Sequence, residues 1–221
     1  PKTFVMAEGE QTIDGKTYTF DEKGVGTLKQ DKWNQLLETY ENDSSVNQLI
    51  FVQYQGGSNA QVILYEKQNG SWKEDFSCQG YVGGNGIDKV KEGDRKTPTG
   101  VFGFTKAFGI KDNPGAKLPY TKLNPYLYWC GDEQWYNTLV DVREIHHECS
   151  GEHLISYVPH YNYVLAIDYN PQCIFGKGSA IFLHCTGSNP YTGGCVAVSE
   201  SNMIRIMQTV DKGAKICIYP Q

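Results

Sequence analysis

A histidine and a cysteine near the C-terminus are the residue types of a nucleophilic enzyme. Residues 181–184 form an apolar, strand-like run that ends in His184, and a loop of Gly, Ser, Asn and Pro leads to Cys195. An imidazole takes the proton of a nearby thiol or stabilises its thiolate, and glycines let backbone N–H groups approach an oxyanion. The pattern indicates cysteine catalysis or, in the plainer interpretation, a buried cysteine and a core-edge histidine in a β-hairpin.

The same segment resembles the active-site motif of the L,D-transpeptidases, cysteine enzymes that cross-link bacterial peptidoglycan. Their pattern is a His, a loop, and then Ser/Thr-His-Gly-Cys followed by an apolar residue. The matching positions are His184, Thr192, Gly194, Cys195 and Val196. The chain departs from the pattern at Gly193, where the family has a second His, at Ala197, where it has a polar residue, and in its shorter spacing. A subgroup of the family has Gly or Ala before Gly-Cys and continues with Cys-Val-Ala, so the departures bear more on substrate preference than on chemistry.

Three further segments resemble the same family, in the same order along the chain. Residues 94–104 resemble its Thr-Pro-x-Gly-x-Phe element, and they predict a turn at 97–100 followed by a strand at 101–104. Residues 152–154 and 163–170 resemble segments of the subgroup that has Gly or Ala before Gly-Cys. The resemblance therefore extends over about residues 49–219, which is most of the chain.

The resemblance implies a cysteine acyltransferase that acts on peptidoglycan stem tetrapeptides. Cys195 would attack the residue before the terminal D-Ala, with His184 as the base and the backbone N–H groups of Gly194 and Cys195 at the oxyanion. D-Ala would leave, and an amine would resolve the thioester as a 3-3 cross-link, or water would resolve it in an L,D-carboxypeptidase. Carbapenem-type inhibitors would acylate the same thiol. A cell-wall-binding protein with an inactive domain is the alternative from another class.

Several residues are candidates for substrate binding in this cleft. The family-like position of His153 suggests that its ring replaces the second histidine missing at position 193. The other candidates are Trp129, Tyr191, Thr192 and Gly193.

A histidine-rich stretch at residues 146–153 offers a rival chemistry. His146, His147, Cys149 and His153, with two glutamates among them, are metal-ligand types. The Cys-x-x-Cys and His-Glu-x-x-His spacings are both missing. We therefore expect a polar loop, no metal and no cofactor, and we keep a structural zinc as the alternative.

The N-terminal segment predicts a small β unit of its own. Residues 11–25 indicate a two-strand hairpin with turns at Asp14-Gly15 and at residues 21–24. It resembles one copy of the choline- or glucan-binding repeat of Gram-positive surface proteins, and an ordinary hairpin extension is the alternative. The repeat implies a cell-wall polymer as a partner and an extracellular, wall-associated location. Because Pro1 is no initiator Met, we expect a processed or truncated piece, and nothing follows from the missing export signal.

Composition limits the remaining functions. The net charge is −5 among 221 residues and no basic cluster interleaves with aromatics, which argues against nucleic acid. No apolar run reaches the roughly 18 residues of a membrane span. Seven cysteines leave at least one thiol unpaired in a monomer, and Cys195 is the candidate. Strand alternation places the Cys185 side chain on the face opposite His184.

The elements that position these residues are mostly strands. With 15 Tyr and 24 Gly the chain predicts a mainly β fold with a few short helices, a mixed β barrel or sandwich of the L,D-transpeptidase type. We expect a hairpin unit at 1–28, a helix and linker at 29–48, and a catalytic domain at 49–221. Helices are expected at 32–40 and 199–210. Strands are expected at 49–54, 61–67, 71–76, 138–142, 163–168, 180–185, 195–198 and 215–219.

Overall fold

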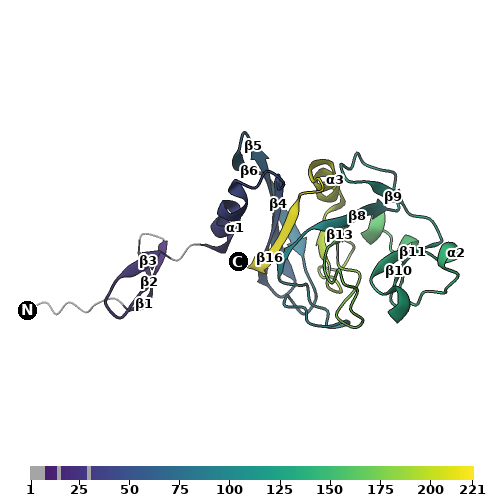
Figure 1. Cartoon of the computed structure of the whole chain (residues 1–221), viewed down its shortest axis with the longest axis horizontal. Coiled ribbons are helices and arrows are strands. Elements are labelled where there is room, and N and C mark those ends of the chain that lie inside the picture. Colours follow the sequence, from purple (N-terminus) through teal and green to yellow (C-terminus); the bar gives the residue numbers. More distant parts are fainter. Residues whose placement is uncertain (1–7, 14–15, 29–30) are drawn as a thin grey trace, which may run out of the picture. The chain divides into compact units, whose positions relative to one another are not determined.

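The computed structural model describes residues 8–13, 16–28 and 31–221, and the chain divides into two compact units, Pro1–Asp43 and Ser44–Gln221 (Figure 1). In its described residues the first unit holds one helix and a three-stranded antiparallel sheet in the order β1-β2-β3. The predicted two-strand hairpin is thus incomplete, because the turn at residues 21–24 returns the chain as a third strand. Their bounds are β1 Gly9–Ile13, β2 Lys16–Phe20, β3 Gly26–Leu28 and α1 Lys32–Glu41.

The first unit contains two elements that the sequence predicts. The Asp21 carboxylate accepts hydrogen bonds from the Lys23 and Val25 N–H groups, at 2.9 and 2.8 Å, which closes the turn between β2 and β3. The predicted Asp14-Gly15 turn lies outside the described residues. Helix α1 begins after Asp31, whose side chain accepts from the Trp33 N–H, and it confirms the helix expected at 32–40.

The second unit is built on one ten-stranded mixed sheet in the order β7-β16-β4-β5-β6-β15-β14-β13-β8-β9. The bounds are β4 Gln48–Gly56, β5 Asn59–Gln68, β6 Ser71–Tyr81, β7 Gly100–Phe102, β8 Phe104–Gly109, β9 Tyr120–Lys122, β13 Val164–Ile167, β14 Phe182–Cys185, β15 Val196–Val198 and β16 Lys215–Pro220. Most neighbours are antiparallel, but β16 pairs with β4, β14 with β15 and β8 with β9 in parallel. The prediction of a mainly β chain with a few short helices is confirmed.

Local signals in the sequence set two features of this sheet. Asn69 and Gly70 adopt φ values of 53° and 82°, so these two residues form the hairpin turn that joins β5 to β6. The strand expected at 101–104 is instead split at Gly103: β7 pairs with β16, whereas β8 pairs with β13. The period of apolar residues cannot reveal this change of partner.

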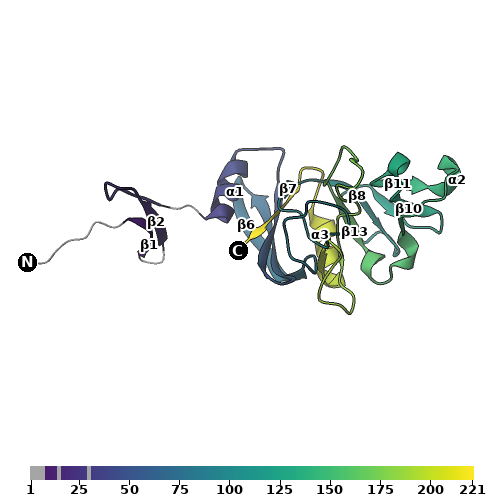
Figure 2. The same cartoon turned by 90° about the horizontal axis from the view of Figure 1, so that it is seen from below.

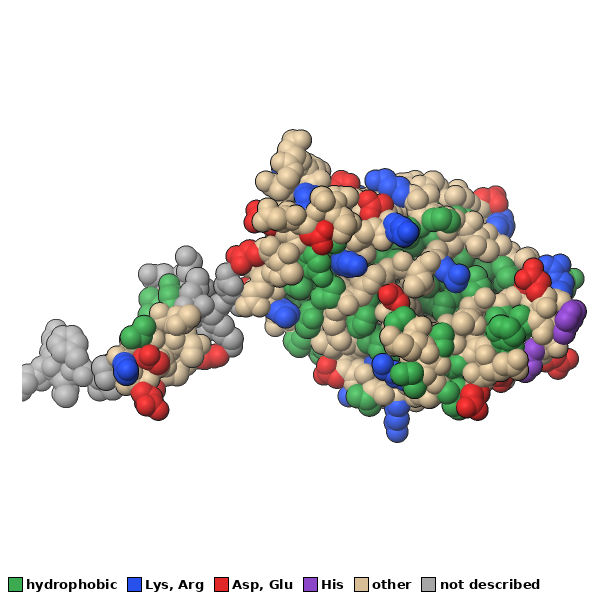
Figure 3. Space-filling view, in the orientation of Figure 1, with side chains coloured by type: hydrophobic (Ala, Val, Ile, Leu, Met, Phe, Trp, Pro, Cys, Tyr) green, Lys and Arg blue, Asp and Glu red, His purple; other side chains and the backbone are tan. Residues whose placement is uncertain are grey.

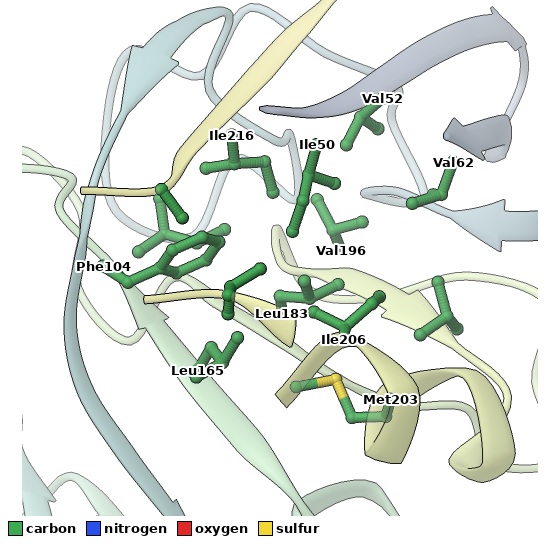
Figure 4. Packing of buried hydrophobic residues seen from close by; sticks show 14 of the residues in the cluster. Ile50, Val52, Val62, Phe104, Leu165, Leu183, Val196, Met203, Ile206 and Ile216 are labelled. Carbon is green, nitrogen blue, oxygen red and sulfur yellow. The ribbon is translucent and has the colours of Figure 1, made fainter. Parts of the chain in front are cut away.

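The main core lies between the sheet and helix α3, Glu200–Thr209 (Figure 4). The Ser199 side chain caps α3 by accepting from the Asn202 N–H, and α3 confirms the helix expected at 199–210. Met203 and Ile206 of the helix point at Leu183 of β14. Their side chains are fully buried, so α3 fixes β14 from one face.

A smaller sheet at one end of the second unit covers the opposite face of β14 (Figure 2). Its strand order is β11-β10-β12, and short helical segments surround it. The bounds are β10 Leu127–Cys130, η1 Glu133–Trp135, β11 Thr138–Asp141, α2 Val142–Ile145, β12 Glu152–His153, η2 Leu154–Ser156 and η3 His160–Asn162. A second apolar cluster joins it to the main sheet through Trp129, Leu154 and Phe182. We call residues 123–162 the cover.

The surface carries no large field of one charge on the face shown in Figure 3, where acidic and basic side chains alternate. Histidine side chains gather at the end of the second unit where Figure 1 places α2. No helix in the described part of the chain is both long and apolar enough to span a bilayer.

Candidate active site

The sheet and the cover enclose a cavity of about 620 Å³ that contains the predicted nucleophile and base. Cys195, His184, Gly194, Thr192, Gly193, Tyr191 and Trp129 are among the residues that line it. Also at its wall are Lys89, Glu92, Gly131, Tyr136, Ser150, Gly151, Glu152, Tyr157, His160, Tyr161, Ser179, Ala180, Ile181 and Asn189. Among the predicted site residues, only His153 is missing from this lining.

Strand alternation explains why His184 and Cys195 share this cavity. Leu183 and Val196 face each other across the parallel pair β14 and β15, and both side chains enter the main core. The residues next to them in the chain, Phe182 and His184 beside Leu183 and Cys195 beside Val196, therefore lie on the other face. Phe182 and Cys195 belong to the second cluster, and His184 and Cys195 both line the cavity. Cys185 belongs to the main core, so the prediction that it faces away from His184 is confirmed.

The thiol of Cys195 is buried and held from two sides. Its Sγ donates to the Ala180 carbonyl oxygen at 3.2 Å and accepts from the Phe182 N–H at 3.3 Å. Both partners belong to the strand-like run that leads to His184. The nucleophile is thus fixed in one position at the cavity wall, with 7% of the residue exposed.

The tight turn before Cys195 is held by two threonine hydroxyls. Thr192 Oγ1 donates to the Cys195 carbonyl oxygen at 2.7 Å, and Thr97 Oγ1 donates to the same oxygen at 3.0 Å. Thr97 belongs to the predicted 97–100 turn, so two family-like segments meet at the nucleophile. Gly194 has φ 148°, and a Cβ there would lie 2.9 Å from the Lys96 carbonyl oxygen, so this position requires glycine.

The hydrogen bonds of this turn separate the two predicted oxyanion donors. The Gly194 N–H donates to Thr192 Oγ1 at 3.1 Å. Among the described residues, the Cys195 N–H has no backbone or side-chain acceptor. The geometry therefore favours the Cys195 N–H as an oxyanion donor and gives Gly194 the role of shaping the turn.

The tautomer of His184 follows from its hydrogen bond. Nδ1 lies 2.8 Å from the Cys185 carbonyl oxygen, which only accepts, so Nδ1 carries the proton. Nε2 is consequently unprotonated and can take a proton. The rings of His160 and Tyr161 meet the His184 ring edge-on, with centroids at 5.8 and 5.6 Å, and fix its plane.

His160, and not His153, is the second histidine beside His184. The His160 ring lies over Gly187, where a Cβ would come within 2.2 Å of it, so a residue without a side chain is needed there. His153 instead stacks on Tyr128, with Nε2 2.8 Å from the Pro125 carbonyl oxygen and Nδ1 3.1 Å from Ser156 Oγ. His160 could not be predicted from the sequence, because it lies in a short helical segment outside every recognisable motif.

Burial makes both reacting groups neutral at rest. Desolvation, with a smaller contribution from the negative charge of Glu152, raises the pKa of the Cys195 thiol to about 12. Desolvation lowers the pKa of His184 to about 4, and His160 contributes to this. At pH values between about 4 and 12, the cavity is therefore lined by a neutral thiol and a neutral imidazole. Of the two modes left open by the sequence, proton transfer during attack is therefore favoured over a preformed ion pair.

A carboxyl group whose pKa lies near neutral pH lines the cavity. Burial raises the pKa of Glu152 to about 7, although the hydrogen bond from the Tyr161 hydroxyl opposes this. Tyr161 also packs edge-on against His184. Glu152 and Tyr161 thereby connect the cover to the base, a connection that the sequence did not predict.

A buried ion pair supports the wall on the other side of Cys195. Lys89 Nζ lies 2.9 Å from Asp94 Oδ1, and the two side chains are 2% and 8% exposed. Burial alone would raise the pKa of Asp94, but hydrogen bonds from Lys89 and from the N–H groups of Val90, Lys96 and Lys91 hold that pKa far below its usual range. Lys89 Nζ would lie 3.7 Å from a Cβ at Gly194. The ion pair therefore fixes the conformation of the loop at residues 89–96, and the turn before Cys195 packs against this loop.

Asp94→Ala is expected to lower the free energy of unfolding by about 3–5 kcal/mol, because it leaves the Lys89 ammonium buried without its partner. Urea denaturation followed by fluorescence measures this. Asp112→Ala is the matched control, since the Asp112 side chain is 94% exposed beside Lys122, and it should unfold like the parent chain. Equal midpoints for the two variants would contradict the structural role of the pair.

Comparisons with solved structures give distant likenesses. The chain resembles the helical cell shape determining protein Pgp2 from Campylobacter jejuni at 19% identity and a TM-score of 0.45, covering 85% of this chain and 55% of that one. It resembles Bd1075 from Bdellovibrio bacteriovorus at 14% identity and a TM-score of 0.44, covering 79% of this chain and 48% of that one. It resembles the Ldtfm-avibactam carbamoyl enzyme at 12% identity and a TM-score of 0.33, covering 97% of this chain and 94% of that one. The chain thus spans about half the length of the first two.

The family comparison is the decisive one. No curated protein matches the chain. The family model of the YkuD L,D-transpeptidase catalytic domain matches residues 31–218, which include Cys195, His184 and the 97–100 turn. It begins after the N-terminal hairpin, and no comparison supports a wall-binding repeat there. Because the match covers most of the sequence, the chain belongs to the L,D-transpeptidase catalytic domain family.

Proposed function

We propose that the chain is a cysteine acyltransferase that forms 3-3 cross-links from peptidoglycan stem tetrapeptides. One observation carries the proposal: a fixed thiol and an imidazole with unprotonated Nε2 line the same cavity of a family domain. The cavity of about 620 Å³ lies within the usual range for small-molecule and peptide sites.

The first half of the reaction is acylation of Cys195. The thiol attacks the carbonyl carbon of the residue before the terminal D-Ala, and its proton passes to His184 Nε2 as the S–C bond forms. The Cys195 N–H stabilises the oxyanion. The amide bond then breaks, His184 returns the proton to the D-Ala amine, and a thioester remains on Cys195.

The second half of the reaction, the resolution of the thioester, distinguishes a transpeptidase from a carboxypeptidase. A stem amine attacking the thioester gives a 3-3 cross-link, whereas water gives a tripeptide and makes the chain an L,D-carboxypeptidase. A wall-binding protein with an inactive domain is the remaining candidate. Incubation with a disaccharide-tetrapeptide, followed by mass spectrometry, separates the three: dimer supports the proposal, tripeptide alone supports the carboxypeptidase, and unchanged substrate with no D-Ala contradicts both enzymes.

The substrate-binding proposal rests on the cavity wall. Trp129 donates from Nε1 to Asn137 Oδ1 at 2.9 Å, and its ring packs on Phe182, so it is a rigid apolar surface. Tyr191 is 44% exposed at the rim beside Arg95. A Cβ at Gly193 has nothing within 4 Å, so the position where the family has a histidine is open space for the stem peptide.

His160→Ala is expected to slow acylation by about 10- to 100-fold, because His184 loses a ring that fixes its plane. His160 also lowers the pKa of His184, so its removal should shift the acid limb of the pH–rate profile to higher pH. Stopped-flow acylation between pH 3 and 8 measures both. His153→Ala is the control: a larger loss there than in His160→Ala would restore the assignment made from sequence.

We also propose the organisation and location that the sequence suggested. Residues 1–28 are proposed to bind a cell-wall polymer as one repeat, residues 29–48 to link, and residues 49–221 to catalyse, outside a Gram-positive cell at its wall. Only the small antiparallel sheet of the first segment supports its role. Binding of the full chain to purified cell walls, compared with a chain lacking residues 1–28, tests it.

A further inference from the structure

Four metal-ligand side chains of the cover converge outside the catalytic cavity. They are Cys130, Asp132, His147 and Cys149, and one ligand atom of each lies within 4.8 Å of all the others. We propose that these residues bind one zinc ion, which holds the cover in shape and takes no part in acyl transfer.

The ligand atoms are already arranged around the Asp132 carboxylate. His147 Nε2 lies 3.0 Å from Asp132 Oδ2, and Cys130 Sγ lies 3.7 Å from the same oxygen. In a tetrahedral zinc site, bonds of about 2.0–2.3 Å separate the ligand atoms by roughly 3.3–3.8 Å. The side chains therefore need to contract by only about 1 Å to enclose the ion.

The chemistry of the set selects zinc among the common ions. Two thiols, one imidazole and one carboxylate are ligands of borderline softness, whereas calcium and magnesium require oxygen ligands throughout. Four protein ligands also fill a tetrahedron and leave no open position for a substrate. The set thus resembles a structural site.

The backbone is shaped to bring these ligands together. They come in two pairs, each with one intervening residue, from the end of β10 and from the loop after α2. Gly131 and Gly151 permit the approach, since a Cβ on Gly151 would lie 2.5 Å from the Gly131 nitrogen. Ser150 supplies an outer contact: its N–H donates to Asp132 Oδ2 at 2.9 Å and its hydroxyl donates to Oδ1.

The position of the cluster suggests its purpose. Gly131, Ser150, Gly151 and Glu152 line the catalytic cavity, and they lie next to the ligands in the chain. Between β10 and β12 the register covers only two residue pairs, so few ladder bonds hold this wall. A zinc ion joining residues 130–132 to residues 147–149 would fix the wall without entering the cavity.

Binding has a proton balance that can be measured. The two thiols bind as thiolates, so they release their protons as the S–Zn bonds form, and no oxidant or reductant is needed. Affinity should consequently fall as the pH is lowered.

Zinc content of the full chain tests the proposal. The protein, purified with reductant and without chelator, should retain one zinc per chain after dialysis, and a competing chromophoric chelator gives its affinity. Ser150→Ala should weaken binding by about 10- to 100-fold as an outer contact. Cys149→Ser and His147→Ala should weaken it further. Cys173→Ser is the matched control, a partly exposed cysteine outside the cluster, and it should bind like the parent chain.

Cobalt substitution and thiol counting complete the test. A cobalt-loaded chain should show thiolate-to-cobalt absorption, which Cys149→Ser diminishes and Cys173→Ser preserves. Zinc that is absent, or that survives in both Cys149→Ser and His147→Ala, overturns the proposal. A parent mass lower by two hydrogens, with Cys130 and Cys149 joined and no zinc bound, also overturns it in favour of a disulfide. These readouts do not involve acylation, so they stand whether or not the proposed transferase activity is found.

Discussion

Cys195→Ala is expected to abolish both the thioester with a stem tetrapeptide and the adduct with a carbapenem. Among the residues that the structure describes, Cys195 is the only one with a sulfur atom in the lining of the cavity. The fold should persist, because a methyl group replaces a thiol whose contacts are one bond to the Ala180 carbonyl and one from the Phe182 N–H. Intact-mass spectrometry after incubation with each acyl donor detects the adducts.

Cys185→Ala provides the matched control for this experiment. Cys185 is also fully buried and lies one residue beyond His184, but its side chain enters the main core on the other face of β14. The variant should keep a stoichiometric adduct. An adduct that maps to any cysteine other than 195, or one that persists in Cys195→Ala, would refute the assignment of the nucleophile.

Residues whose role is set by neighbours in the chain were predictable from sequence. The Asn69-Gly70 turn, the Ser199 helix cap and the glycine turn before Cys195 depend on local conformation and hydrogen bonding. Alternation along one strand likewise placed Cys185 opposite His184. These local rules account for the strands and for the placing of the predicted nucleophile and base in one cavity.

Residues brought together by the cover were not predictable in this way. His160 reaches His184 from a short helical segment, and Glu152 and Tyr161 meet through a side-chain bond, without any sequence period that could reveal them. The assignment of His153 to the cleft followed a local likeness, but its ring packs on Tyr128 instead. Pairing over long distances in the chain depends on the whole fold, which a single sequence does not display.

The charge state of the Cys195 and His184 side chains could not be predicted from the sequence for the same reason. From the residue types, a thiolate–imidazolium pair and a neutral pair were equally acceptable. The choice depends on burial, which lowers the pKa of His184 and raises that of Cys195 because both charged forms lose hydration. A neutral resting pair requires the substrate to be in place before the proton moves. A thiol that is neutral at rest also reacts more slowly with adventitious electrophiles than a thiolate does.

His184→Ala is expected to slow acylation by about two to four decades, the usual effect of losing a positioned acid–base group. In the parent chain the imidazole is neutral above a pKa of about 4, so the rate should be flat from neutral pH down to about pH 4 and then fall as His184 is protonated. Without this base, the rate should depend on ionisation of the thiol, whose pKa burial raises to about 12. It should therefore rise about tenfold per pH unit through the neutral range.

Acylation rates of both chains between pH 3 and 9, with iodoacetamide alkylation of Cys195 followed beyond pH 9, measure these profiles. Alkylation of the parent chain should keep rising beyond pH 9, because its thiol ionises later than a free cysteine with a pKa of about 8.5. An alkylation plateau at neutral pH, or an acid limb near the ordinary histidine value, would instead indicate a preformed ion pair. A flat profile retained in His184→Ala would remove His184 from the mechanism and make His160, the other histidine in the cavity, the base to test.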